Sequence, residues 1–86
     1  MLRFRESAFD HGITEDQIRE VIANKWGMTK WFPIHDDSDG NSQDMAVGFD
    51  AEGADIEIGI SYIEDDDMVF HADNVTPNWQ VEYNKG

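Results

Sequence analysis

The chain has 86 residues, a hydrophobic share of 40% with five Phe, three Trp and two Tyr, and a formal net charge of −13. This length is enough for one small domain, residues 1–86, and too short for two. The chain contains no cysteine, which excludes disulfides and thiolate metal ligands. No apolar run approaches the roughly 18 residues of a membrane span and no apolar leader is evident, so a cytoplasmic location without membrane contact is expected.

The charge is distributed unevenly along the chain. Residues 1–30 hold five acids and five bases, whereas residues 31–84 hold fourteen acids and no Lys or Arg. Affinity for nucleic acid comes mainly from Lys and Arg at the phosphates, so the charge disfavours RNA binding outside the first thirty residues. The same charge would suit an acidic interaction surface, or solubility in a salty host. Of these five bases, Arg3, Arg5, Arg19 and Lys25 are the predicted phosphate contacts of an RNA-binding function.

The first quarter of the chain predicts a short strand near Leu2–Arg5 and one or two helical turns that end at Gly12. The sharpest helix signal is "ITEDQIREVIANKW", residues 13–26. Thr14 followed three residues later by Gln17 is typical of a capping box. Apolar side chains then recur at helical spacing, which predicts one buried helix face.

The segments after residue 30 predict a sheet. Pro33 restricts the first of them to a sheet edge, and Gly53 can supply the left-handed residue of a hairpin turn that places Phe49 opposite Ala54. The three tryptophans are expected mainly in the core. The fold class is therefore α+β, with one or two N-terminal helices packed on one face of a small, mainly antiparallel sheet of three to four strands. The expected strands are residues 31–35, 45–49, 54–63 and 68–73.

The face on which His71 lies depends on the loop that precedes its strand. A three-residue loop over residues 65–67 sets Tyr62 beside Phe70 and turns His71 outward, on the same face as Glu57. A four-residue loop turns His71 into the core instead. The first arrangement is favoured because it aligns larger apolar groups and buries no charge.

An outward histidine beside a carboxylate has two interpretations. Imidazole titrates near neutrality, so His71 and Glu57 could perform acid–base chemistry, but the same pattern is also typical of an ordinary polar sheet face. The acidic loop around Asp37 resembles the start of a calcium-binding loop, yet Ser42 and Gly48 occupy the positions that need Gly and Glu. The histidines lack the close spacing of a metal site. We therefore predict no metal and no cofactor.

Three stretches carry a resemblance to a known family. They are "SAFDHGIT" running into "EDQIREVI", then "VGFDAEGADIEIGISY", then "VFHADN". With these stretches the chain resembles the short BrnT-like toxins of bacterial toxin–antitoxin pairs, within the broader RelE/ParE-like group. The resemblance spans roughly residues 3–76. It implies a small α+β ribonuclease that acts with groups on the open face of its sheet and is silenced by a cognate antitoxin.

The resemblance also implies a set of site residues. His11, Arg19 and His71 carry over by position, with His71 as proton donor or acceptor and Arg19 as a phosphate contact, and Glu57 beside His71 completes the predicted catalytic set. The family continues with Arg or Lys after its His-Ala pair, where this chain has Asp73.

This departure leaves several functions open. The first is a toxin-like ribonuclease domain, with its activity retained or lost, which predicts that Arg3, Arg5, Arg19 and Lys25 converge on the side of His71. The alternative is a non-catalytic acidic module that binds a basic partner protein, and a housekeeping domain without any site is the third.

Overall fold

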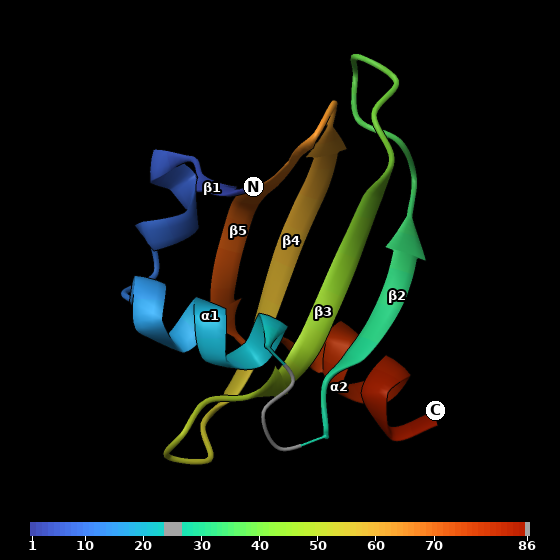
Figure 1. Ribbon diagram of the computed structural model, residues 1–86. Coiled ribbons are helices and arrows are strands. Elements are labelled where there is room, and N and C mark those ends of the chain that lie inside the picture. The colour runs from blue at the N-terminus through green and yellow to red at the C-terminus, as the bar shows by residue number, and fades with distance from the viewer. Residues whose placement is uncertain (24–26, 86) are drawn as a thin grey trace.

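The structure is a computed structural model that describes residues 1–23 and 27–85. Five strands form one sheet in the order β1-β5-β4-β3-β2, in which β1 runs parallel to β5 and all other neighbours are antiparallel (Figure 1). Within the described residues, neither α-helix has the length and apolar character that a membrane crossing requires. The elements in chain order are β1 (Leu2–Phe4), the 3-10 helix η1 (Glu6–Phe9), α1 (Glu15–Ile22), β2 (Lys30–Ile34), β3 (Gln43–Phe49), β4 (Asp55–Ile63), β5 (Asp66–Asn74) and α2 (Pro77–Lys85).

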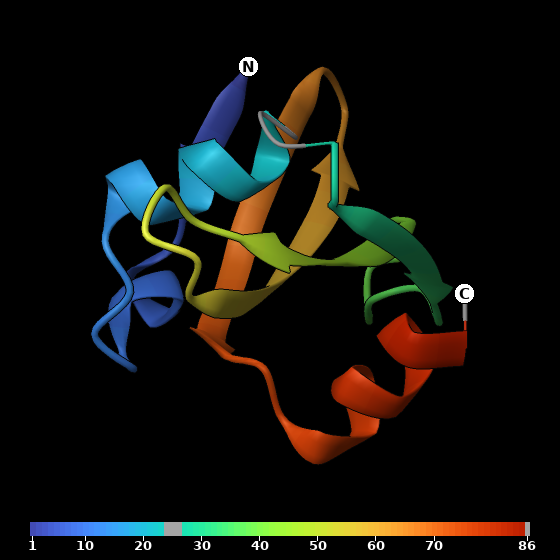
Figure 2. The ribbon, with the colours of Figure 1, turned by 90° about the horizontal axis from the view of Figure 1, so that it is seen from below.

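The α+β class agrees with the structure, but the predicted architecture is wrong. The sheet has five strands rather than three to four, and it is mixed because Leu2 of β1 pairs in parallel with Asp67 of β5. The helices do not form an N-terminal pair on one face, because α2 follows the last strand and lies on the side of the sheet opposite α1 (Figure 2). Trp31, expected mainly in the core, is 41% exposed on the edge strand β2. The pairing of β1 with β5 joins segments about 65 residues apart in the sequence, and no local pattern signals such a contact.

The start of α1 follows the sequence prediction closely. Thr14 Oγ1 accepts a hydrogen bond from the Gln17 N–H at 3.2 Å, and Gln17 Oε1 accepts one from the Thr14 N–H at 2.8 Å. This reciprocal capping box supplies acceptors for two N–H groups at the helix terminus. The predicted helix extended to Trp26, whereas α1 ends at Ile22, and residues 24–26, including Lys25 and Trp26, lie outside the described residues.

The core lies between α1 and the middle of the sheet. Ile56, Ile58 and Ile60 alternate along β4 and are fully or almost fully buried, and Ile18 of α1 belongs to the same cluster. Because β4 is the central strand, its other face is largely covered as well, and Glu57 is only 3% exposed. Burial on both faces of β4 makes each polar residue there depend on a hydrogen-bond partner.

The hairpin between β3 and β4 has a register one residue away from the predicted one. Phe49 pairs with Asp55, not with Ala54. The turn is longer than expected because Asp50 closes it: its N–H donates to the Ala54 carbonyl at 3.1 Å, and its Oδ1 accepts from the N–H groups of Glu52 and Ala54. A one-residue slip exchanges the two faces of a strand, so Val47 lies opposite Glu57 rather than opposite Ile56.

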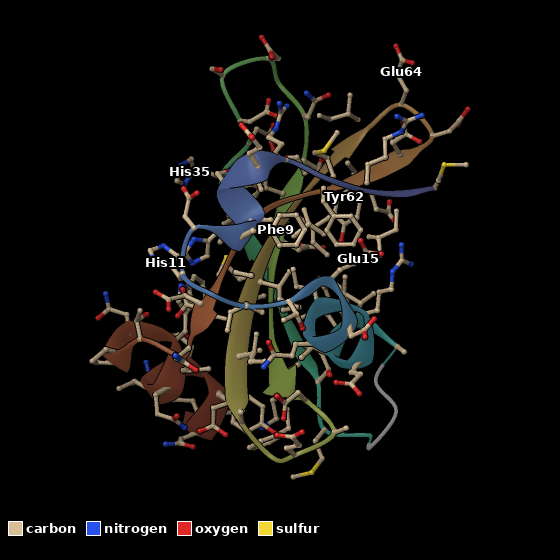
Figure 3. The ribbon with its side chains drawn as sticks, turned by 90° about the vertical axis from the view of Figure 1, so that its left-hand side faces the viewer. Phe9, His11, Glu15, His35, Tyr62 and Glu64 are labelled. Atoms are coloured by element: carbon tan, nitrogen blue, oxygen red, sulfur yellow. The ribbon has the colours of Figure 1, made fainter. Side chains whose placement is uncertain are left out.

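The turn between β4 and β5 also differs from the prediction. The strands are joined by two residues, Glu64 and Asp65, rather than by three, and Glu64 adopts the left-handed φ of 56° that such a tight turn needs (tip labelled in Figure 3). Tyr62 consequently pairs with Asp67, not with Phe70.

A bulge in β5 then restores the predicted face of His71. Ile60 pairs with Val69 and Gly59 pairs with His71, which leaves Phe70 as the extra residue. Gly59 accommodates the Phe70 ring, because a Cβ at this position would lie 2.6 Å from the ring Cζ. The extra residue turns Val69 into the core and His71 to the opposite face, so the outward position of His71 is confirmed although the predicted loop was wrong.

Candidate functional site

His71 and Glu57 meet across β5 and β4 on the sheet face opposite α1. The Nε2 of His71 lies 2.8 Å from Oε2 of Glu57, and the side chains are 30% and 4% exposed, respectively. The second oxygen of Glu57, Oε1, accepts a hydrogen bond from the Thr76 N–H at 2.7 Å. Both carboxylate oxygens therefore have a donor, which compensates for the burial of the group and fixes the orientation of the His71 ring.

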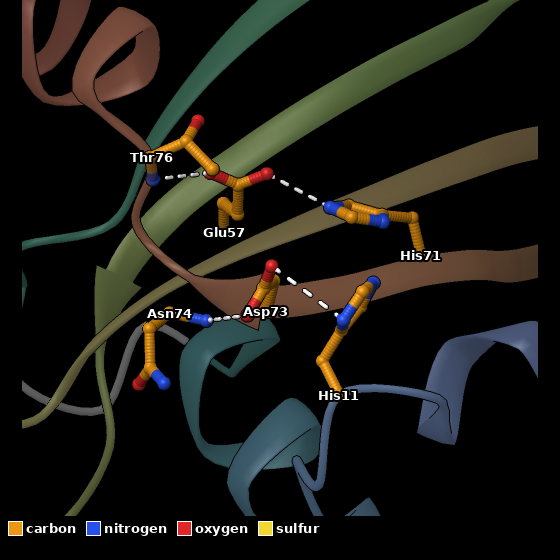
Figure 4. Close-up of polar contacts among 6 residues, drawn as sticks. All are labelled: His11, Glu57, His71, Asp73, Asn74 and Thr76. Carbon is orange, nitrogen blue, oxygen red and sulfur yellow. Dashed lines mark hydrogen bonds and ion pairs between the residues drawn. The ribbon is translucent and has the colours of Figure 1, made fainter.

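His11 reaches the same region from the connection between η1 and α1 (Figure 3). Its Nδ1 lies 3.7 Å from Oδ2 of Asp73, and its ring packs edge-on against the ring of His71 with centroids 5.6 Å apart. Figure 4 shows the two imidazoles side by side, each with its own carboxylate. We call this group of His11, Glu57, His71 and Asp73 the paired-histidine site.

The position of His11 follows from the way η1 attaches to β5. The strand β1 pairs with residues 67–69 of β5. The chain then continues along β5 through two hydrogen bonds, from the Arg5 N–H to the Val69 carbonyl at 2.9 Å and from the Ser7 hydroxyl to the Phe70 carbonyl at 2.6 Å. Gly12, with a φ of +83°, turns the chain toward α1 immediately after His11. Anchored in this way, His11 lies at the edge of β5 next to His71.

The hydrogen bonds of the site determine which ring nitrogens remain for chemistry. An ionised Glu57 can only accept, so Nε2 of His71 carries the proton in this contact and Nδ1 of the neutral ring keeps its lone pair. Nδ1 of His11 faces Asp73, which leaves its Nε2. In Figure 4 these two remaining nitrogens are turned toward the neighbouring ring. The site thus presents one proton acceptor and, when His11 is charged, one proton donor side by side.

The structure does not bring Arg19 to the histidines. Its Nε lies 2.8 Å from Oε2 of Glu15, and its guanidinium lies 5.3 Å from the centroid of the Phe4 ring, which packs against the core on the α1 side. The sheet therefore separates Arg19 from the paired-histidine site.

Two further bases, the predicted phosphate contact Arg3 and Lys30, are also engaged elsewhere. Arg3 forms an ion pair with Asp66 at 2.9 Å, and Lys30 donates to the Tyr83 carbonyl at 2.9 Å while its ammonium lies over the Tyr83 ring. The predicted convergence of bases on the side of His71 is therefore not seen for Arg3 or Arg19.

The acidic loop between β2 and β3 is closed by its own groups. Oδ1 of Asp37 accepts from the N–H groups of Asp39 and Asn41, both at 2.9 Å, and Oδ2 accepts from the Asn41 side chain at 3.1 Å. The hydrogen bond from the Asn41 backbone is the main cause that lowers the pKa of Asp37. Over the part of the chain that the structure describes, no group of three or more potential metal-ligating side chains is placed to hold an ion.

Two groups that contact the histidines and Glu57, the side chain of Asp73 and the backbone N–H of Thr76, could not be predicted equally well from the sequence. Asp73 follows His71 by two residues, so the alternation of a strand places both on one face, but its contact with His11 depends on how η1 attaches to the sheet edge. The partner that Thr76 offers to Glu57 is a backbone N–H, and no side-chain pattern reveals it.

No protein-family profile matches the chain, and no curated protein shows significant sequence similarity to it. The resemblance to BrnT-like toxins therefore remains a prediction from the three short stretches that carry it.

Proposed function

We propose that this protein is a toxin-like ribonuclease domain of the BrnT-like kind, acting on RNA in the cytoplasm and restrained by an antitoxin partner. The contact between the rings of His11 and His71 carries the proposal. The resemblance selects these two histidines from distant parts of the sequence. Their side chains lie together, each beside a carboxylate, on the face where the family resemblance locates the chemistry.

The proposed reaction uses the two free ring nitrogens. Nδ1 of neutral His71 takes the proton from the ribose 2′-hydroxyl, and the resulting oxygen attacks the adjacent phosphorus. The bond from phosphorus to the 5′-oxygen breaks, and that oxygen takes a proton from Nε2 of the charged His11. The products are a 2′,3′-cyclic phosphate and a free 5′-hydroxyl. Glu57 holds His71 in the required tautomer, and Asp73 faces Nδ1 of His11 and leaves its Nε2 for the proton transfer.

The electrostatics of the chain predict an unusual response to salt. The charged imidazole of His11 supplies the positive charge that a scissile phosphate requires, while the net charge of −13 repels the rest of the RNA. Added salt screens this long-range repulsion. Cleavage should therefore accelerate as salt is raised from low concentration, whereas a basic ribonuclease would lose affinity under the same change.

Induced expression in a bacterial culture tests the proposal. The intact chain should arrest growth, and His71→Ala should relieve the arrest. His35→Ala is the matched control, because His35 is an exposed histidine beyond the end of β2. Normal growth with soluble, folded intact chain would count against the ribonuclease, and arrest that persists in His71→Ala would exclude the paired-histidine site as its cause.

A second candidate function is a non-catalytic acidic module that binds a basic partner protein. It is favoured by the engagement of Arg3 and Arg19 with Asp66 and Glu15, away from the histidines. In that case the paired-histidine site serves only to tie η1 to β5. The two candidates separate in the growth experiment, because the module predicts no arrest and no dependence on His71.

A further inference from the structure

Each histidine of the paired-histidine site has one ring nitrogen beside a carboxylate, which leaves the other nitrogen for a ligand. Nε2 of His71 lies 2.8 Å from Glu57. Nδ1 of His11 lies 3.7 Å from Asp73. Each carboxylate favours a proton on the nitrogen that faces it. Histidines that bind metal ions commonly have such a carboxylate, because it fixes the ring and directs the lone pair of the other nitrogen to the ion.

The two remaining nitrogens, Nε2 of His11 and Nδ1 of His71, belong to rings that contact each other. The ring centroids are 5.6 Å apart, and Figure 4 shows both nitrogens turned toward the neighbouring ring. A Zn²⁺ ion binds an imidazole nitrogen at about 2.0–2.1 Å, so two nitrogens on one ion lie within about 4 Å of each other. Because a ring nitrogen lies outside the ring centroid, rings at this separation can reach that span. Glu57 fixes His71, whereas the His11 side chain is 48% exposed and can rotate toward an ion.

The surroundings supply two protein ligands, and water completes the coordination of such an ion. Over residues 1–23 and 27–85, no group of three or more metal-ligating side chains is placed around an ion. Glu57 is an outer partner rather than a ligand, because its two oxygens accept from His71 and from the Thr76 N–H. Imidazole suits Zn²⁺, Ni²⁺ and Cu²⁺, whereas Mg²⁺ and Ca²⁺ prefer oxygen. The sequence predicted no metal because its histidines are far apart along the chain, and the fold brings two of them together.

We propose that the paired-histidine site binds Zn²⁺ between Nε2 of His11 and Nδ1 of His71, with water at the remaining positions. Binding depends only on the two imidazoles. The same nitrogens transfer protons in the proposed ribonuclease, so the ion inhibits RNA cleavage, and this part of the inference rests on the proposed function. In a chain without ribonuclease activity, the ion ties the connection between η1 and α1 to β5, because His11 and His71 come from these two segments.

Zn²⁺ alone is the probe, added to the intact chain at neutral pH in a buffer with excess Mg²⁺, which occupies the exposed acidic turns. Calorimetry measures the affinity and the number of ions, and the ring signals of the three histidines identify the ligands. We expect one ion per chain. His11→Ala and His71→Ala should each weaken binding by at least the roughly 10–100-fold that loss of an outer partner costs. His35→Ala, at an exposed histidine beyond the end of β2, is the matched control and should leave binding unchanged.

Glu57→Gln tests the tautomer of His71 in the same titration. Its NH₂ group donates to Nε2 of His71 and moves the ring proton to Nδ1, the nitrogen proposed to bind the ion. The affinity for Zn²⁺ should fall roughly 10–100-fold. Circular dichroism of the variant checks that it remains folded.

The outcomes separate the paired-histidine site from general attraction of cations to an acidic chain. Binding that requires both His11 and His71 supports the inference. Unchanged affinity in both variants, loss in only one of them, or no binding in the presence of Mg²⁺ would overturn it. Zn²⁺ binding by a folded chain that cleaves no RNA would count against the ribonuclease and leave the metal site standing. Cleavage that saturating Zn²⁺ does not slow would overturn the inhibition.

Discussion

Replacement of Glu57 separates two roles of the buried carboxylate, one in stability and one in the tautomer of His71. Glu57→Ala removes the acceptor of the Thr76 N–H and the partner of His71 Nε2 together. A buried donor left without an acceptor costs about 1–3 kcal/mol. Because His71 is 30% exposed, water can replace its lost partner. We expect Glu57→Ala to lower the free energy of unfolding by roughly 2–3 kcal/mol.

Glu57→Gln should behave differently. Its amide oxygen can still accept from Thr76, so the stability loss should stay below about 1 kcal/mol. Its NH₂ group, however, donates to Nε2 of His71 and moves the ring proton to Nδ1, the nitrogen proposed to act as base. Glu57→Gln should therefore fold nearly as well as the intact chain and lose any RNA cleavage that the intact chain has.

Urea unfolding of the two variants and of Glu57→Ala combined with His71→Ala provides the measurement. The double variant should be more stable than the sum of the two single losses predicts, by about 1 kcal/mol, because the two side chains interact directly. Equal stability of Glu57→Ala and the intact chain, or additive losses in the double variant, would refute the role given to this contact.

Three further predictions concern the fold. The hydrogen bond from the Gln17 side chain, followed by that from the Ala54 N–H, lowers the pKa of Asp50 below its usual 3.8. The ionised carboxylate therefore stabilises the fold above pH 3.8, and this contribution is lost as the pH falls through the lowered pKa. In urea unfolding at acidic pH, the free energy of unfolding should depend less on pH in Asp50→Asn than in the intact chain, and an unchanged dependence would contradict this. Gly59→Ala should lower the free energy of unfolding by about 1–3 kcal/mol, measured by thermal unfolding, because the new Cβ meets the Phe70 ring. In a Phe70→Ala background the same substitution should lose most of this effect, and an effect that persists would point to another cause. Burial, together with a hydrogen bond to Asp44, raises the pKa of Tyr62 above its usual 10.0. The free energy of unfolding should therefore fall as the pH rises above 10.0, because the tyrosine ionises more readily in the unfolded chain. Tyr62→Phe should flatten this decline in urea unfolding at alkaline pH, and an equal decline in both proteins would argue against the burial effect.

Local signals in the sequence predicted the local parts of the fold. The capping box of Thr14 and Gln17 has the expected reciprocal hydrogen bonds, and Gly53 adopts the left-handed conformation in its turn. Pro33 lies in an edge strand, as proline in a strand requires. These features depend on a few adjacent residues, so one sequence was enough to find them.

The features that were missed depend on contacts across the chain or on one-residue differences. The parallel pairing of β1 with β5 has no local signature. The bulge at Phe70 reverses the face of every preceding residue in β5, and alternation alone cannot anticipate an extra residue. The helix α2 has no apolar stripe, and its signal was Pro77 at the first helical position. Arg19 carried over from the family resemblance, but its place on α1 put it on the wrong side of the sheet.

Cleavage of a short fluorogenic RNA by the purified chain tests the central claim most directly. The intact chain should cleave it and release a 2′,3′-cyclic phosphate. His11→Ala and His71→Ala should each lower the rate by roughly 10²–10⁴-fold, and a single 2′-deoxy substitution at the cleaved position should abolish the reaction. Cleavage that is unaffected by both substitutions, or that persists on the 2′-deoxy substrate, would contradict the proposed chemistry. No cleavage by the folded intact chain would assign the paired-histidine site a structural role and favour the acidic binding module.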